Sequence, residues 1–92
     1  MSAENVARVG VDRVSNGVIT GPGATTVTVN DEIISVIDDT VSTHGDAPHI
    51  QPTIIKGAPT IFAEGKQISL TRISIATCSH SVDTGSNNTF GL

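Results

Sequence analysis

The feature that most limits the fold of this chain is an internal repeat. A segment that begins with glycine occurs three times, at residues 23–30 (GATTVTVN), 57–64 (GAPTIFAE) and 85–92 (GSNNTFGL). A short apolar segment and a spacer come before each copy, and these apolar segments are residues 7–10, 34–37 and 68–71. A recurring order of segments is typical of folds built from one repeated unit. The sequence therefore predicts three repeats, beginning near residues 7, 34 and 68, each with an apolar strand, a loop and a glycine-led strand.

The residue types favour strands over helices. The chain of 92 residues contains 10 valines, 11 isoleucines and 12 threonines, against 2 leucines, 2 phenylalanines and no tryptophan or tyrosine. Side chains that branch at Cβ lose rotamers in a helix and pack well on a pleated surface. Turn formers such as glycine, proline, asparagine and aspartate separate the short apolar runs. The sequence therefore predicts one all-β domain over residues 1–92.

The apolar core of such a domain is thin, so an additional staple is expected. Hydrophobic residues make up 37% of the chain and aromatic residues 2%, and small domains commonly depend on a disulfide, a metal or a partner chain. The single cysteine cannot form a disulfide within the chain. A bound metal is therefore the candidate staple.

Charge and hydropathy argue against two classes of protein. The net charge is −4 and the five basic residues are scattered, which offers no cationic patch to a phosphate backbone and argues against nucleic acid as a partner. No apolar run approaches the roughly 18 residues of a membrane span. The N-terminal segment also lacks the basic and apolar regions of a signal peptide. We therefore expect a protein made in the cytoplasm.

The soft metal ligands are confined to the spacers of the second and third repeats. They are His44 and His49 in one spacer and Cys78 and His80 in the other, and the chain has no other histidine or cysteine. Three imidazoles and one thiolate form a complete tetrahedral set for zinc, and side chains 78 and 80 project to the same side of an extended segment. Surface histidines and a buried cysteine are individually common. Four such residues in two equivalent spacers favour one structural metal ion, because a catalytic zinc keeps a position open for water.

Other groups that could carry chemistry are assigned to turns. Asp31 with Glu32, and Asp38 with Asp39, are adjacent pairs beside turn formers, and neighbours on a strand point to opposite faces. We expect these four carboxylates to have turn and solvation roles, so that asparagine at position 38 or 39 changes little. The chain has no Gly-x-Ser-x-Gly nucleophile motif, and residues 21–23 lack the lysine and the helix of a phosphate loop.

With the repeats and ligands assigned, the sequence resembles the PAAR-repeat family, named for a Pro-Ala-Ala-Arg motif. Residues 6–12 (VARVGVD) are similar to the family's opening strand, and 17–19 (GVI) to the glycine and isoleucine that follow. Residues 23–30 and 57–66 are similar to its Gly-Ser-x-Thr-Val strand and the turn after it, and residues 64–67 (EGKQ) keep the Gly-Lys core of that turn. The chain departs from the family in three places: it has no Pro-Ala-Ala-Arg, Asp31-Glu32 replaces Gly-Lys after Asn30, and Asp38-Asp39 replaces Gly-Asp.

The resemblance implies a small conical domain with pseudo-threefold symmetry and a metal-stapled apex. Members of the family bind one zinc ion near the apex, and the residues in the matching loops here are His44, His49, Cys78 and His80. The family caps trimeric β-helical spikes of contractile phage tails and type VI secretion machines. The resemblance therefore implies a non-enzymatic protein, one copy per spike trimer rather than a homo-oligomer, that leaves the cytoplasm on the machine and contacts a target membrane transiently. A stand-alone zinc-binding interaction module or, less favoured, a zinc hydrolase are the alternatives.

Overall fold

The computed structural model describes residues 4–47, 49–86 and 89–91, and within them every element is a short β-strand. The predicted all-β class is therefore confirmed, and the described residues contain no helix that could cross a membrane. The strands are β1 (Glu4–Asn5), β2 (Arg13–Val14), β3 (Gly17–Gly21), β4 (Ala24–Val29), β5 (Glu32–Ile34), β6 (Thr40–Val41), β7 (Phe62–Ala63), β8 (Lys66–Gln67) and β9 (Phe90–Gly91).

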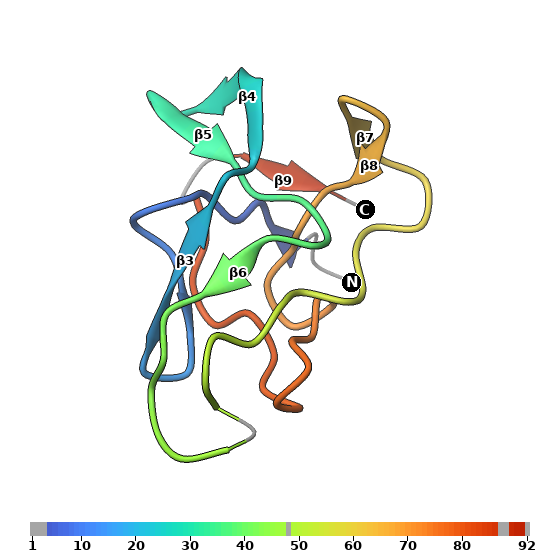
Figure 1. Cartoon of the computed structure of the whole chain (residues 1–92). Helices are drawn as coiled ribbons and strands as arrows, with labels where there is room; N and C mark the ends of the chain where they lie inside the picture. The colour runs from blue at the N-terminus through green and yellow to red at the C-terminus, as the bar shows by residue number, and fades with distance from the viewer. Residues whose placement is uncertain (1–3, 48, 87–88, 92) are drawn as a thin grey trace.

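The described strands form small antiparallel sheets in the orders β1-β9, β2-β3-β6, β4-β5 and β7-β8. Figure 1 shows the β4–β5 and β7–β8 hairpins at one end of the molecule, and the loop after β6 and the loop near residue 78 at the opposite end. The fold thus separates a hairpin end from a loop end.

The β1–β9 pair corresponds to the two hairpins in the sequence repeat, but its strands come from the first and last described residues rather than from neighbouring segments. Val29 pairs with Glu32 in one hairpin and Ala63 with Lys66 in the other. Gly91, which is equivalent to Val29 and Ala63 in the sequence repeat, pairs with Glu4. Consequently the last glycine-led segment finds its partner at the start of the chain rather than in a following repeat.

Backbone hydrogen bonds join the three apolar opening segments in a closed ring. Ala7 N–H donates to the Ser69 carbonyl (2.9 Å), Ser69 N–H to Ser35 (2.9 Å) and Ser35 N–H to Ala7 (3.0 Å). Each segment therefore contacts both others. A second set repeats the pattern: Val9 donates to Ile33, Ile37 to Gln67 and Thr71 to Asn5.

The opening segments were predicted as strands, but most of their pairing is by single bridges. These bridges are Val6 with Leu70, Arg8 with Ile34, and Val36 with Ile68. A ladder needs two segments that run side by side over several residues. Here each short segment divides its hydrogen bonds between two neighbours, so regular strands do not extend through the ring.

Close backbone approach explains why each of the three repeated segments begins with glycine. A Cβ atom added at any of these three glycines would lie within 3.0 Å of a carbonyl oxygen in, or next to, an opening segment, closer than real Cβ contacts allow. The distances are 2.6 Å from Gly23 to Ile34, 2.8 Å from Gly57 to Ile68 and 2.9 Å from Gly85 to Val6.

Two apolar clusters form the core, and the second lies beneath the candidate ligands. The first contains Val6, Ala24, Val29, Ile34, Val36, Ala58, Ala63, Ile68 and Leu70. The second contains Ala7, Val14, Ile19, Val41, Ile54, Ala76, Cys78 and Val82. Because Cys78 belongs to the second cluster, that side chain anchors the ligand group to the core.

The expected solvent role is wrong for Asp39. Its side chain is buried, with 2% of the residue exposed, and it accepts hydrogen bonds from Gly23 N–H (2.9 Å), Val36 N–H (3.0 Å) and Ser35 Oγ (3.0 Å). The chain turns back after the opening segment, which leaves donors inside the fold that need an acceptor. Asp38 behaves as expected: it is an exposed turn residue with a φ of 73° and a surface ion pair to Lys66.

Candidate metal centre

His44 and His49 lie in one loop after β6, and the loop's own backbone brings them together. His44 N–H donates to the His49 carbonyl (3.0 Å), and His49 N–H donates to the Asp46 carbonyl (2.8 Å). Gly45 has a φ of 153°, which few other residues adopt. The loop therefore turns back on itself, and the two imidazoles face the same region.

Cys78 and His80 come from a tight turn and not from the extended segment that the sequence predicted. Ser79, between them, has a φ of 72°. Ser79 N–H donates to the Ala76 carbonyl, and Ala76 N–H donates to the His80 carbonyl, each at a distance of 2.9 Å. The turn still directs both side chains to one place, because their ligand atoms belong to the same group as those of the histidine loop.

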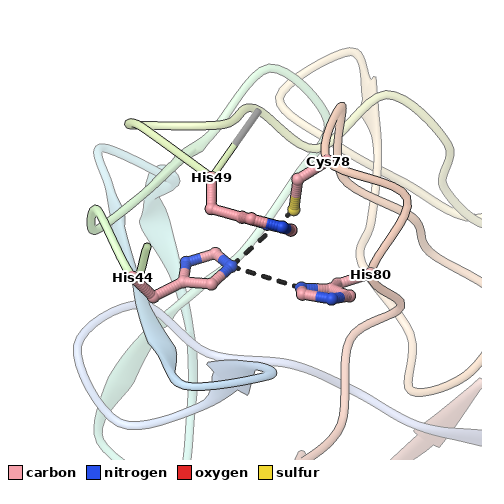
Figure 2. Close-up of side chains that lie close together, drawn as sticks. All are labelled: His44, His49, Cys78 and His80. Carbon is pink, nitrogen blue, oxygen red and sulfur yellow. Dashed lines mark hydrogen bonds between the residues drawn. The ribbon is translucent and has the colours of Figure 1, made fainter. Parts of the chain in front are cut away.

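The structure brings the four residues that the sequence selected into one cluster. Each of His44, His49, Cys78 and His80 offers one ligand atom, and these atoms all lie within 4.8 Å of one another. Figure 2 shows the side chains converging from the two loops. The cluster could therefore hold a metal ion.

Two of the distances in the cluster agree with the edges of a zinc tetrahedron. His44 Nε2 lies 3.2 Å from His80 Nδ1 and 3.8 Å from Cys78 Sγ. Zinc bonds of about 2.0–2.1 Å to nitrogen and 2.3 Å to sulfur give tetrahedral edges of about 3.3 Å between two nitrogens and 3.6 Å between nitrogen and sulfur. His44, His80 and Cys78 therefore lie at separations close to those that one bound zinc ion would give them.

His49 adds independent support, because its Nδ1 is buried and has no hydrogen-bond partner among the described residues. A buried polar atom without a partner costs about 1–3 kcal/mol. A coordinate bond would give this lone pair a partner. Nδ1 is therefore the atom through which His49 fits a metal ion.

His44 is held in the orientation that coordination through Nε2 requires. Its Nδ1 lies 3.0 Å from the Ser42 carbonyl oxygen. A carbonyl only accepts, so Nδ1 carries the proton and donates, and Nε2 keeps its lone pair. Metal-bound histidines commonly have such an outer partner, which fixes the tautomer and the ring. Residue types alone could not reveal this contact, because the group that acts is a backbone carbonyl.

The three imidazole rings pack against one another over the second apolar cluster. The ring centroids of His49 and His80 are 4.6 Å apart with an interplanar angle of 15°, and His44 lies 5.1 Å from His49 and 5.4 Å from His80. Cys78 is 4% exposed. Within the described part of the chain no carboxylate joins this group, so it offers nitrogen and sulfur, the donors that zinc prefers, rather than the oxygen donors of calcium and magnesium.

The arrangement defines a class: a small all-β domain with several short antiparallel sheets and a group of three histidines and one cysteine that could hold a metal ion. Comparisons with protein-family models and with curated proteins found no match to the chain. Its function must therefore be argued from the arrangement itself and from the resemblance of its motifs.

Proposed function

We propose that this chain is a PAAR-like spike tip, which caps one end of a trimeric β-helical spike and forms its point. The spike belongs to a contractile phage tail or to a type VI secretion machine. The tip leaves the cytoplasm on that machine and touches a target envelope briefly, and its role is mechanical rather than enzymatic.

One observation carries the proposal: the closed ring of hydrogen bonds among Ala7, Ser35 and Ser69. One of these residues comes from each sequence repeat, and each donates to one of the other two and accepts from the other. Repeats arranged in this way around one axis give a single polypeptide approximate threefold symmetry, which is what a monomer needs to face three identical chains. The same symmetry accounts for one tip per spike trimer.

The hairpin end is the end that would face the spike. It presents the β4–β5 and β7–β8 hairpins, and the β1–β9 pair is a third two-stranded antiparallel element of the fold. The open strand edges at the end of a β-helix need a cover, and such short elements can add to them. Phe62 in β7 is 58% exposed, so it offers an apolar contact to the spike.

The loop end is the proposed point, stabilised by one structural zinc ion bound to His44, His49, Cys78 and His80. Structural zinc contributes about 10–16 kcal/mol of binding free energy in small domains. That value is comparable to or larger than the net stability of about 5–15 kcal/mol of a typical folded protein. Four protein ligands complete the tetrahedron and leave no position for a reactive water, which argues against hydrolysis.

The deciding experiment is native mass spectrometry of the chain mixed with its cognate trimeric spike. We expect one tip per three spike chains, and Phe62→Glu should weaken the complex. Ile55→Glu is the matched control, because Ile55 has a similar exposure of 61% and lies outside the hairpins. Three tips per trimer would overturn the proposal. A chain that binds zinc but no spike would instead support the stand-alone zinc-binding module.

A further inference from the structure

We infer that Gly17, in the first repeat, is a positioning residue of the metal centre: its missing side chain leaves the space in which His44 turns Nε2 toward the metal. The inference rests on the metal centre proposed above. It adds to the metal centre a residue of the first repeat, which provides none of the four ligands.

The space beside Gly17 is occupied by the segment that leads to His44. A Cβ atom at this position would lie 2.5 Å from His44 Nδ1, 2.7 Å from Val41 Cγ1 and 2.8 Å from the Ser42 carbonyl oxygen. Contacts below 3.0 Å force a neighbour to move. Two of these three atoms are the two ends of the His44–Ser42 hydrogen bond, so any side chain here would press directly on the bond that orients the imidazole.

Backbone conformation does not explain the glycine. Gly17 is not among the described glycines with positive φ, and it pairs with Val14 in the β2–β3 ladder. Alanine would accept this backbone without strain. The requirement at position 17 is therefore one of space.

The neighbouring backbone cannot easily move aside to admit a side chain. Val18 N–H donates to Ser42 Oγ, and Ser42 N–H donates to the Val18 carbonyl, each at a distance of 2.9 Å. These two bonds lock β3 against the segment that leads to His44. The imidazole is then the group that gives way, and a ring displaced by a few tenths of an ångström misses the tolerance of about 0.2 Å on metal–ligand distances.

Cobalt(II) is a suitable probe, because its visible spectrum reports the geometry and the ligands of a tetrahedral site. We expect Gly17→Ala to lower cobalt affinity by about 10- to 100-fold, the usual effect of losing an outer partner of a metal-bound histidine, and to shift the d–d bands. Affinity is measured by competition with a chelating dye, and the spectrum is recorded at saturating cobalt.

Gly57→Ala is the matched control. Its Cβ would also meet atoms at 2.7 and 2.8 Å, namely Gln67 Cβ and the Ile68 carbonyl oxygen, but these lie at the hairpin end. This variant should lose thermal stability while keeping the wild-type cobalt spectrum. Gly17→Ala with wild-type affinity and spectrum would overturn the inference, and so would a Gly57→Ala spectrum shifted in the same way.

Two further measurements separate the remaining explanations. If Val41→Ala, added to Gly17→Ala, restores the wild-type spectrum, then crowding of Val41 is the cause and the inference fails. In the wild-type chain, ¹⁵N spectra of the metal-loaded protein should show His44 bound through Nε2, and coordination through Nδ1 would overturn the inference even if Gly17→Ala does not fold. A wild-type chain that takes up no cobalt would overturn the metal centre itself, and the inference with it.

Discussion

Two neighbouring aspartates show how strongly the position of one residue decides what a carboxylate does. Asp38 is exposed and forms a surface ion pair with Lys66 over 3.6 Å, an interaction worth about 0–1 kcal/mol. Asp39 is buried and accepts three hydrogen bonds from groups inside the fold. Asp12, in the first repeat, plays a similar part by accepting from the Arg8 backbone and guanidinium.

This contrast gives the first prediction. Asp39→Ala leaves the N–H groups of Gly23 and Val36 without their acceptor, and each buried unpaired donor costs about 1–3 kcal/mol. We expect a loss of about 3 kcal/mol in the free energy of unfolding, measured in denaturant with zinc in excess. Asp38→Asn is the neighbouring control and should change stability by less than about 0.5 kcal/mol. Equal effects of the two variants would contradict the burial of Asp39.

The second prediction concerns the ligands. Cys78→Ser removes the thiolate, and the remaining imidazoles lose the charged donor that zinc favours. We expect elemental analysis after dialysis to fall from one zinc per chain to well below one, and the melting temperature to approach that of the chelated wild type. Asp46→Asn is the control, since Asp46 is exposed in the histidine loop and lies outside the ligand group. Undiminished zinc in Cys78→Ser would contradict the proposed donor set.

At the residue scale, the sequence was sufficient to select the candidate metal ligands. It did not reveal the contacts that depend on the backbone or on the absence of a side chain. The chain has only three histidines and one cysteine, so a cluster of soft ligands could be selected by residue type alone. Ser42 acts through its backbone carbonyl and Gly17 through the absence of a side chain. Neither role can be recognised from the residue type. Asp39 was assigned wrongly because a turn pattern does not say which carboxylate faces the interior.

Among the elements, the two hairpins use the same kind of turn with different residues. Asn30 and Asp31 join β4 to β5 with φ values of 54° and 68°, and Glu64 and Gly65 join β7 to β8 with 51° and 81°. Positive φ at both central positions is the type I′ geometry, which matches the twist of paired strands and favours Asn-Gly. Each hairpin therefore contains one of the two preferred residues.

The third prediction tests these turns. Gly65→Ala should destabilise the protein by about 1 kcal/mol, the cost of a left-handed backbone for a residue with Cβ. The loss is purely conformational, because no atom lies within 4 Å of the added Cβ. Asp31→Gly should change stability in the opposite direction and by less, since aspartate tolerates this region. Denaturant midpoints at saturating zinc measure both, and changes of the same sign would contradict the turn assignment.

The elements also show where sequence patterns stop being informative about this fold. The glycine-led segment at residues 23–30 contains β4, as the sequence predicts, and its partner β5 lies close to it in sequence. Ile54 and Ile75, by contrast, form only isolated bridges, with Ala76 and Ser81. The β1–β9 pair joins Asn5 to Phe90. A pattern within one segment cannot reveal such a distant partner, because the pairing depends on how all three repeats close.

For the whole molecule, the separation of hairpin end from loop end predicts an uneven distribution of stability. The ring of opening segments is surrounded by both apolar clusters, which include Val6, Ala7, Ile34, Val36, Ile68 and Leu70. The described residues of the histidine loop, 42–47 and 49–50, contribute no buried apolar side chain, and Ile50 beside His49 is 60% exposed. Segments with few buried contacts open at lower free energy than the core does. The metal is thus proposed to act where the chain's own packing is weakest.

The last prediction follows from this distribution and is tested by hydrogen exchange with and without a zinc chelator. Chelation should expose the amides that close the ligand loops, those of His44, His49, Ala76 and Ser79, whose partners all lie within the same loops. The ring amides of Ala7, Ser35 and Ser69 bond across the repeats, and they should remain the most protected amides of the chelated protein.

Cys78→Ser in excess zinc should reproduce the chelated pattern, because it removes a ligand without adding a chelator. Asp46→Asn should keep the zinc-bound pattern. If the loop amides stay as protected as the ring amides after chelation, the loops are stabilised by packing alone, and the metal does not hold the loop end together. A loss of protection confined to these loops would instead support the proposed staple at the loop end. Coordinate bonds there would supply the rigidity that a chain with 2% aromatic residues cannot obtain from a large apolar core.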